Sequence, residues 1–231
     1  AELARRGVAY ITLAHLFYRG IATNAPALPF LPDALYNRIF CQPRKGLTHL
    51  GRAAVRAMYE QRILVDVSHM RADALSETFA LLDELDREHD ADPANFPVIA
   101  SHAGYRFGNQ AYMLDRHTIE QIARRDGVIG LILARHQLQD GLGDGDGIAH
   151  TAATIEAHVR EIHSITGSNA FTGIGSDLDG FIKPTMSAIE ASEDLAALER
   201  PLRDAFPDDA DAILCGNAMR VVRRVLSQRP V

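Results

Sequence analysis

The length and composition of the chain favour one domain with an enzyme-like core. It has 231 residues, of which 47% are hydrophobic, so we expect residues 1–231 to form a single domain. A net charge of −6 argues against a nucleic-acid-binding surface, because such surfaces carry clustered Lys and Arg. Two cysteines, Cys41 and Cys215, indicate neither a disulfide framework nor a Cys-based zinc site. No apolar stretch approaches the roughly 20 residues that a membrane span requires.

Five apolar runs follow one another along the chain. Each is continuously rather than alternately hydrophobic, which is typical of parallel strands buried on both faces. We therefore predict five parallel strands. They cover residues 8–14, 63–68, 97–101, 127–133 and 171–176.

Helical patterns separate these runs. Apolar residues recur every three to four positions in residues 75–85 and 155–162, and a last helix is predicted near 209–227. Asp115 and Ser192 are predicted N-caps, and Gly167 a helix stop. Strands and helices that alternate in this way indicate a parallel α/β sheet or barrel.

Two long loops break the pattern. Residues 16–46 contain four prolines and no clear helix, and residues 136–150 are rich in Gly and Asp. Long loops without regular structure in compact domains are usually lids or binding loops. The second loop does not fit a calcium-binding EF-hand, since Leu142 occupies a ligand position, so we interpret it as a flexible surface loop.

His69 and His102 each end a predicted strand and lie 33 residues apart. That spacing fits one strand–helix–strand unit, which would bring both imidazoles to the carboxyl ends of neighbouring strands, where a barrel enzyme can hold a metal. A single Ser-His pair could equally be a hydrogen-bonded histidine at a strand end. The repetition favours the metal site.

Two other strands also end in polar residues. His15 follows the first run, and Asp177 follows the fifth. Imidazoles that hold an ion beside a carboxylate that accepts a proton indicate metal-assisted hydrolysis. The simpler alternative for Asp177 is a turn cap, with Gly180 supplying an unusual backbone angle. Asp179 competes for the same role, since strand alternation would aim it the same way.

Several motifs resemble the renal (membrane) dipeptidase family of the amidohydrolase superfamily. They are residues 13–15, 46–51, 64–69, 98–102, 173–180 and 216–221. The resemblance implies a TIM-like (β/α) barrel that hydrolyses small peptides or related amides. It also implies that His69 and His102 bind one zinc of a binuclear pair. By the same resemblance His15 would polarise the scissile carbonyl or steady the tetrahedral intermediate, and Asp177 would be the general base and acid.

The chain departs from that family in its metal ligands. The family's His-x-Asp strand and the Glu that bridges both metals have no counterpart here. We therefore expect an incomplete barrel, about five strands of eight without the N-terminal strands, that corresponds to the carboxyl-terminal portion of a dipeptidase. A zinc shell that lacks those ligands should bind weakly. Exposed edge strands should favour pairing with another copy of the chain, and the compartment, cytoplasmic or periplasmic, stays open.

A second departure concerns the substrate. The family places an Arg shortly after the second metal-binding His, and Tyr112 stands at that position here. Tyr112 cannot form a bidentate ion pair with a carboxylate, but Arg106 and Arg116 lie nearby and could replace the missing Arg. Two alternatives to the dipeptidase remain open: an inactive barrel fragment with a binding or assembly role, and an amidohydrolase that acts on a non-peptide amide.

Overall fold

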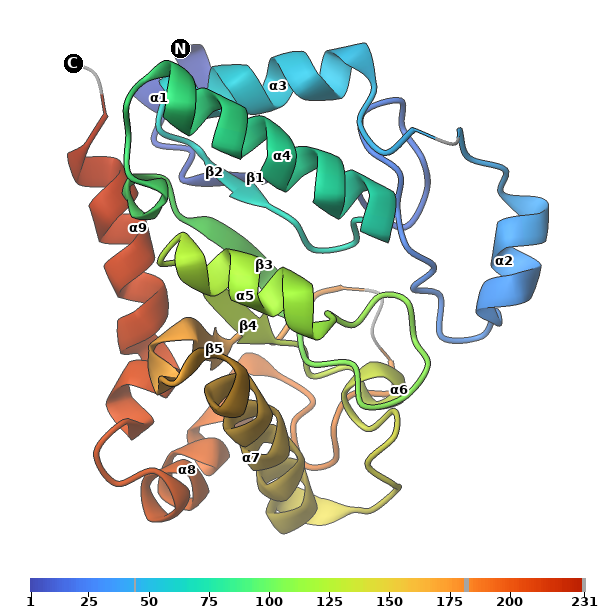
Figure 1. The fold of residues 1–231 in the computed structure, drawn as a ribbon. Helices are drawn as coiled ribbons and strands as arrows, with labels where there is room; N and C mark the ends of the chain where they lie inside the picture. The colour runs from blue at the N-terminus through green and yellow to red at the C-terminus, as the bar shows by residue number, and fades with distance from the viewer. Residues whose placement is uncertain (44, 181–182, 230–231) are drawn as a thin grey trace.

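A computed structural model describes residues 1–43, 45–180 and 183–229. Within these ranges five strands form one sheet in the order β1-β2-β3-β4-β5, and every neighbouring pair is parallel (Figure 1). Each strand lies beside its neighbour in sequence, as in an open section of a TIM-like barrel. The predicted fold class is therefore confirmed. The strands are β1 (Tyr10–Thr12), β2 (Leu64–Asp66), β3 (Val98–Ala103), β4 (Val128–Leu131) and β5 (Thr172–Ile174).

Helices connect the strands and close the chain. The described α-helices are α1 (Glu2–Arg5), α2 (Asp33–Ile39), α3 (His49–Glu60), α4 (Ala72–Glu88), α5 (Arg116–Arg124), α6 (Arg135–Leu138), α7 (Gly147–Thr166), α8 (Glu199–Ala205) and α9 (Asn217–Ser227). Shorter helical segments are η1 (Pro93–Asn95), η2 (Asn169–Phe171), η3 (Ser192–Leu198) and the π-helical turn η4 (Ala212–Gly216). None of these helices is long and apolar enough to cross a membrane.

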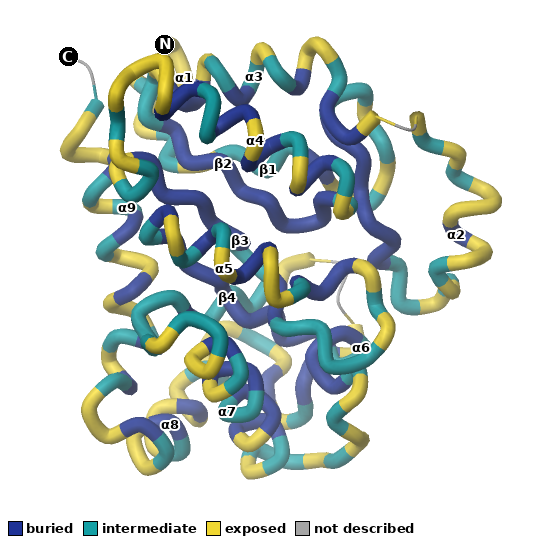
Figure 2. The backbone as a smooth tube through the Cα atoms, viewed as in Figure 1, coloured by how far each residue is buried: buried dark blue, intermediate teal, exposed yellow. Residues whose placement is uncertain are grey.

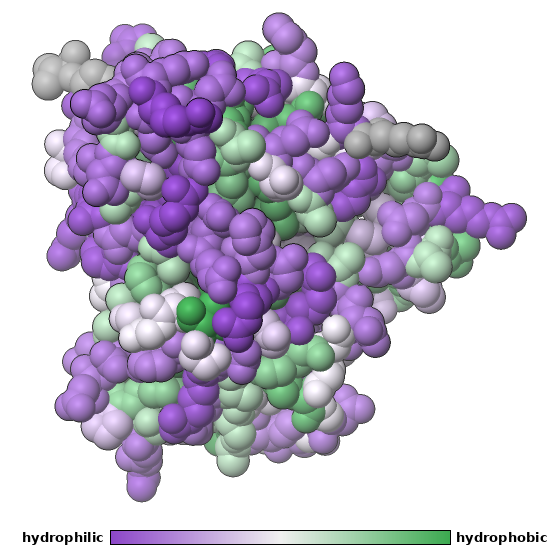
Figure 3. All heavy atoms as spheres, in the orientation of Figure 1, coloured by the Kyte–Doolittle hydropathy of each residue, from purple (hydrophilic) through white to green (hydrophobic). Residues whose placement is uncertain are grey.

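The two faces of the sheet are covered differently. Val65, Val98 and Ile129 pack into the large core with α3, α4, α5 and α7, while the adjacent residues in the strands form a second, smaller cluster with α9. This alternation follows from the two-residue period of a strand. Figure 2 shows β2, β3 and β4 as the buried centre of the molecule, whereas β1 is more exposed, and the outer face of the covering helices is mostly hydrophilic (Figure 3).

Two of the three predicted helix boundaries are confirmed. The Asp115 side chain accepts a hydrogen bond from the backbone N–H of Thr118 and so caps α5. Gly167 ends α7 with a φ of 77°, in the left-handed region where glycine has no steric cost. The prediction for Ser192 is wrong: it is the first residue of η3, and the Asp194 carboxylate bonds the preceding backbone instead.

The first long loop contains a helix that the sequence analysis missed. Pro32 precedes α2 and Asp33 lies in its first turn, both favourable at a helix start. Seven residues are too few to show a clear apolar period, and only Tyr36 is buried. Figures 1 and 2 show α2 standing out from the body of the molecule. In the second loop, residues 139–146 lie outside helices and strands.

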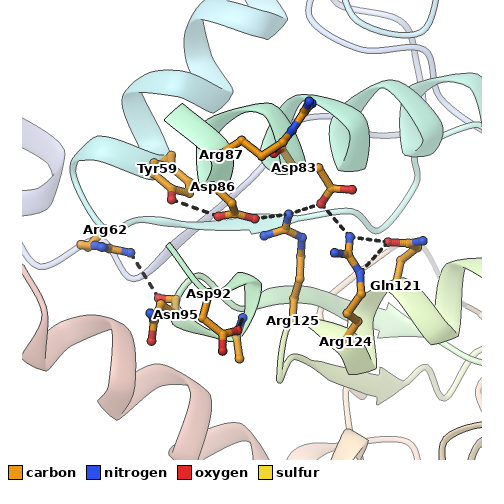
Figure 4. A network of polar contacts seen from close by, with 11 residues as sticks. Tyr59, Arg62, Asp83, Asp86, Arg87, Asp92, Asn95, Gln121, Arg124 and Arg125 are labelled. Atoms are coloured by element: carbon orange, nitrogen blue, oxygen red, sulfur yellow. Dashed lines mark hydrogen bonds and ion pairs between the residues drawn. The ribbon is translucent and has the colours of Figure 1, made fainter. Parts of the chain in front are cut away.

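A network of paired charges lies at the amino-terminal end of β4 (Figure 4). The guanidinium of Arg125 is fully buried and donates to Asp83 and Asp86, with 2.6 Å to the Asp86 carboxylate. The Tyr59 hydroxyl donates to the same carboxylate at 3.0 Å, and burial together with this contact raises the pKa of Tyr59 to about 12. Breaking a buried ion pair by removing one partner typically costs about 3–5 kcal/mol, so this end of the sheet serves stability.

Candidate active site

His69 and His102 meet at the carboxyl-terminal edge of β2 and β3. Their Nε2 atoms lie 3.0 Å apart, and the two rings are nearly perpendicular with centroids 4.9 Å apart. Each histidine lies three residues beyond a register pair, Asp66 opposite Ile99, so parallel pairing delivers both rings to the same height. The convergence that the sequence predicted for these two side chains is therefore present.

His69 is buried, and one of its ring nitrogens has no hydrogen-bond partner. Its residue takes a φ of 65°, a left-handed conformation that is uncommon for a residue with a Cβ and that turns the chain out of the strand direction. Its Nδ1 is buried without a hydrogen-bond partner. Burial, and then the neighbouring His102 and His15, lower the pKa of His69 well below its ordinary value. The lowered pKa favours the neutral imidazole of His69, which is the form that binds metals.

His102 is held at three points. Its Nδ1 lies 2.7 Å from the Ser101 hydroxyl, and its backbone N–H donates to the Ser68 hydroxyl at 3.1 Å. Its carbonyl accepts a hydrogen bond of 2.6 Å from the Tyr112 hydroxyl. Ser101 in turn donates to the Asp66 carboxylate at 2.6 Å. The hydrogen-bond partners of His102 therefore come from β3 and from the segments that follow β2 and β3, with Asp66 of β2 behind them.

Tyr112 lies in the wall of the site. It is buried, its ring contacts His69 edge-on with centroids 4.9 Å apart, and its hydroxyl is used by His102. Burial, and then the charges of Asp66 and Asp177, raise the pKa of Tyr112 well above its ordinary value, so the hydroxyl stays protonated. Tyr112 therefore contacts both histidines, His69 through its ring and His102 through its hydroxyl.

His15 and Asp177 complete the group. The His15 ring is exposed and lies 4.5 Å from the His69 ring, centroid to centroid. Asp177 is half-buried, and burial raises the pKa of its carboxyl while the charges of His102 and His15 oppose that rise. The charges of His102 and His15 therefore lie within electrostatic range of the Asp177 carboxyl.

The turn after β5 differs from the expectation. Asp177 itself takes the positive φ, 55°, and the backbone N–H of Gly180 donates to its carbonyl at 2.8 Å. A Cβ on Gly180 would come within 2.4 Å of the Asp177 carboxylate, so a larger residue there would require that side chain to move. Asp179 is exposed, and strand alternation does not aim it with Asp177, because the chain has already turned.

Arg106 is bound to its own loop. Its Nε donates to the Met113 carbonyl at 2.9 Å and one Nη donates to the Ala111 carbonyl at 3.2 Å. Burial raises the pKa of Asp33, and the charge of Arg106 opposes that rise; the same charge adds to the hydrogen bonds from Thr118 that lower the pKa of Asp115 against the effect of burial. Arg106 therefore braces the loop that carries Tyr112.

The histidine pair fits part of a zinc shell. Two imidazole nitrogens that share one zinc, each about 2.0–2.1 Å from it, lie roughly 3–4 Å apart, and the observed Nε2 atoms lie 3.0 Å apart. The buried, unpaired Nδ1 of His69 and its lowered pKa suit a neutral ligand. Among the described residues, however, no group of three or more His, Cys, Asp or Glu side chains is arranged to hold one ion. The fit thus extends to two ligands.

Sequence reasoning missed the residues behind His102. Asp66 received no role, and Ser68 and Ser101 were considered only as neighbours of their own histidines. The sequence signal was a carboxylate within an apolar run: the structure buries Asp66 fully, and a buried carboxylate requires partners.

A parallel sheet in this order, with histidines converging at its carboxyl-terminal edge, is the arrangement in which barrel enzymes can hold a metal. The chain belongs to the membrane dipeptidase family, peptidase family M19, whose model matches residues 1–229.

Known relatives are consistent with this assignment. Dipeptidase 3 of Rattus norvegicus is 26% identical over 97% of this chain and 42% of its own length. A metallopeptidase from Rhodobacter sphaeroides, solved with a phosphinate mimic of the dipeptide L-Ala-D-Ala, has a TM-score of 0.63 and 23% identity over 78% of this chain and 48% of its own. An amidohydrolase from Pseudomonas aeruginosa has a TM-score of 0.69 and 16% identity over 97% of this chain and 66% of its own. The structural matches support the fold. The chain spans less than half the length of the rat relative.

Proposed function

We propose that the chain carries the zinc-binding and proton-transfer residues of a metal-dependent hydrolase of dipeptides or similar small amides. The convergence of the His69 and His102 Nε2 atoms to 3.0 Å carries this proposal. Family membership supports it in general terms, since relatives in the family are dipeptidases.

His69 and His102 would hold the zinc through their Nε2 lone pairs. A zinc ion bound there supplies a Lewis acid for the peptide carbonyl and makes water a better nucleophile near neutral pH. The buried walls formed by Tyr112 and His69 exclude bulk water from one side of this position. Low local polarity strengthens each electrostatic contact with the substrate.

Asp177 and His15 would divide the remaining work. Asp177 takes the proton from the attacking water and later passes it to the leaving amine. Burial favours this exchange, because the raised pKa of Asp177 brings its proton affinity closer to that of the groups it serves. His15, exposed at the mouth and beside His69, would donate to the oxygen that becomes negative as the carbonyl is attacked.

The part of the site that would bind the substrate carboxylate offers less positive charge than the resemblance to the family predicts. The Tyr112 hydroxyl donates to the His102 carbonyl, and two nitrogens of Arg106 donate to carbonyls of its own loop. We therefore propose small dipeptides whose carboxylate is held weakly. The dipeptide mimic in the Rhodobacter sphaeroides protein supports a substrate of this size.

A second candidate function rests on the metal shell. The family's bridging Glu and second zinc site have no counterpart among the motifs of this chain, and the described residues offer only two converging ligands. That observation favours a binding or assembly role without turnover. The edges of β1 and β5 would serve such a role, since within the described part of the chain each of these strands is paired on one side and could pair with a second copy on the other.

Zinc titration and a hydrolysis assay separate the two candidates. The purified chain would be titrated with zinc by calorimetry and then incubated with L-Ala-D-Ala, other dipeptides and a non-peptide amide. Zinc binding with dipeptide hydrolysis supports the hydrolase. Zinc binding without hydrolysis of any substrate, together with a dimer in analytical ultracentrifugation, supports the assembly role. A chain whose zinc binding is unchanged by His69→Ala contradicts both assignments of the site.

A further inference from the structure

We infer that Asp66 and Ser101 are positioning residues that keep the ring hydrogen of His102 on Nδ1, so that the Nε2 lone pair faces His69. The part of this inference that concerns metal affinity rests on the function proposed above. The tautomer itself follows from assigning the donor and the acceptor of each hydrogen bond around Asp66.

Asp66 accepts four hydrogen bonds. Oδ1 receives the backbone N–H groups of Ser68 at 3.1 Å and Ser101 at 2.9 Å. Oδ2 receives the hydroxyls of Thr12 and Ser101, each at 2.6 Å. An ionised carboxylate has about four lone-pair sites and no hydrogen to give, so this arrangement uses its full accepting capacity. The geometry requires every one of these neighbours to be the donor.

The hydroxyl of Ser101 has one hydrogen, and Asp66 takes it. Ser101 Oγ also lies 2.7 Å from His102 Nδ1, and only the ring can supply the hydrogen for that second bond. His102 therefore carries its hydrogen on Nδ1. In a neutral imidazole the other nitrogen, Nε2, then holds a lone pair, and this atom is the one 3.0 Å from His69 Nε2.

The hydroxyl of Ser68 is the last group of this hydrogen-bond cluster. Its oxygen accepts the backbone N–H of His102 at 3.1 Å, and its own hydrogen can go to Ser101 Oγ at 3.3 Å. Ser101 Oγ then donates once and accepts twice, which is the full capacity of a hydroxyl. Each group in this cluster is satisfied in one arrangement of hydrogens, so the ring of His102 has one preferred tautomer and one preferred orientation.

A polar partner behind a ligating histidine fixes the ring and raises its basicity, and removing that partner typically costs 10- to 100-fold in metal affinity or activity. Here the partner of His102 is a serine that Asp66 orients. His69 has no equivalent, since its Nδ1 is unpaired. The effect of the cluster should therefore fall on His102 alone.

Ser101→Ala tests this inference, and the chain offers two matched variants. Ser101→Thr keeps the hydroxyl, and its extra methyl can enter the cavity of about 170 Å³ that Ser101 lines beside Gly130 and Val221. Thr12→Val removes a hydroxyl from the same Asp66 oxygen without touching His102. A purely structural role predicts similar effects for Thr12→Val and Ser101→Ala.

The readout is the ¹⁵N spectrum of the histidine rings in zinc-free protein, at a pH above about 6.5, the ordinary histidine pKa. The His102 signals would be assigned by their loss in His102→Asn. We expect a pyrrole-type Nδ1 and a pyridine-type Nε2 for His102 in the natural protein, in Ser101→Thr and in Thr12→Val. In Ser101→Ala we expect a mixture of tautomers. An Nε2–H tautomer in the natural protein, or an unchanged ring spectrum in Ser101→Ala, would overturn the inference.

Zinc titrations of the same proteins give the second readout. Ser101→Ala should bind zinc about 10- to 100-fold more weakly than the natural chain, and the other two variants should bind within a fewfold of it. Equal zinc affinity in Ser101→Ala and the natural chain would overturn the positioning role. If none of the proteins binds zinc, the proposed function fails, while the ring spectra still decide the tautomer.

Discussion

The two Ser-His pairs at the ends of β2 and β3 are equivalent in sequence and unequal in structure. Ser101 bonds the ring of its own histidine, whereas Ser68 bonds the backbone of His102, the histidine on the neighbouring strand. Both serines therefore serve His102. His69 has a left-handed backbone and a buried Nδ1 without a partner.

The difference shows how one site can combine a fixed ligand with an adjustable one. His102 is held through its ring, its N–H and its carbonyl, so its position is set before any ligand arrives. His69 is held by burial and by one backbone contact, in which its carbonyl accepts from the N–H of Ala25 at 2.7 Å. Changes around His102 should therefore lower metal affinity by removing hydrogen bonds that hold this ligand in place.

The largest expected effect is a loss of catalytic rate on substitution of Asp177, which lies outside the His69–His102 pair. Asp177→Asn removes the proton acceptor while keeping its size, so in zinc-loaded protein we expect kcat to fall on the order of 10²- to 10⁴-fold with zinc still bound. Asp179→Asn is the control, since Asp179 is exposed and lies past the turn. The measurement is steady-state dipeptide hydrolysis beside metal analysis. Equal kcat values for the two variants would rule out the role of Asp177.

A second buried histidine, outside the site, extends the comparison to acid stability. His158 accepts from the Tyr105 N–H through Nδ1 and donates to the Leu138 carbonyl through Nε2, and burial lowers its pKa from 6.5 to about 4. Because the folded pKa lies below the unfolded one, its stabilising effect is complete above about pH 6.5 and is lost as the pH falls through about 4. The loss amounts to about 3 kcal/mol.

Urea unfolding at several pH values between 7 and 4 measures this loss. In His158→Leu the unfolding free energy should be lower at pH 7 and should fall less steeply with acid than in the natural chain. Parallel pH curves for the two proteins would show that another group governs acid unfolding.

A smaller effect should follow from the tyrosine that holds the His102 carbonyl. Tyr112→Phe leaves that carbonyl without its donor, so we expect a loss of about 1–3 kcal/mol in unfolding free energy. Tyr10→Phe, on the exposed edge strand, should stay within about 0.5 kcal/mol of the natural chain. Chemical denaturation of both variants gives the comparison. An unchanged Tyr112→Phe midpoint would show that His102 keeps its position without this bond.

The smallest expected effect concerns the substrate carboxylate. A charged hydrogen bond to that group is worth about 1.5–3 kcal/mol, roughly 10- to 150-fold in affinity. Since Tyr112 and Arg106 are both engaged elsewhere, we expect a dipeptide and its C-terminal amide to differ in kcat/KM by less than about tenfold. A preference for the free acid above that range, abolished by Arg106→Ala, would show that Arg106 leaves its loop to bind substrate.

Much of the fold was predictable because its signals are local. Continuous apolar runs identified the five strands, and polar residues directly after them identified the histidine pair. The hydrogen-bond cluster around Asp66 was not predictable in the same way, since it depends on which residue of β2 lies opposite which residue of β3. The helix α2 was too short to show a period, and the left-handed turn at Asp177 removed the alternation that the sequence reasoning assumed.

The register pair of Asp66 and Ile99 has a consequence for folding experiments. A strand rises about 3.3 Å per residue, so a slip of one position would carry one imidazole past the other and turn Asp66 toward the opposite face. A misregistered chain would retain its helices and strands and lose the paired nitrogens. Zinc binding during refolding should therefore report correct strand alignment, a property to which circular dichroism is blind.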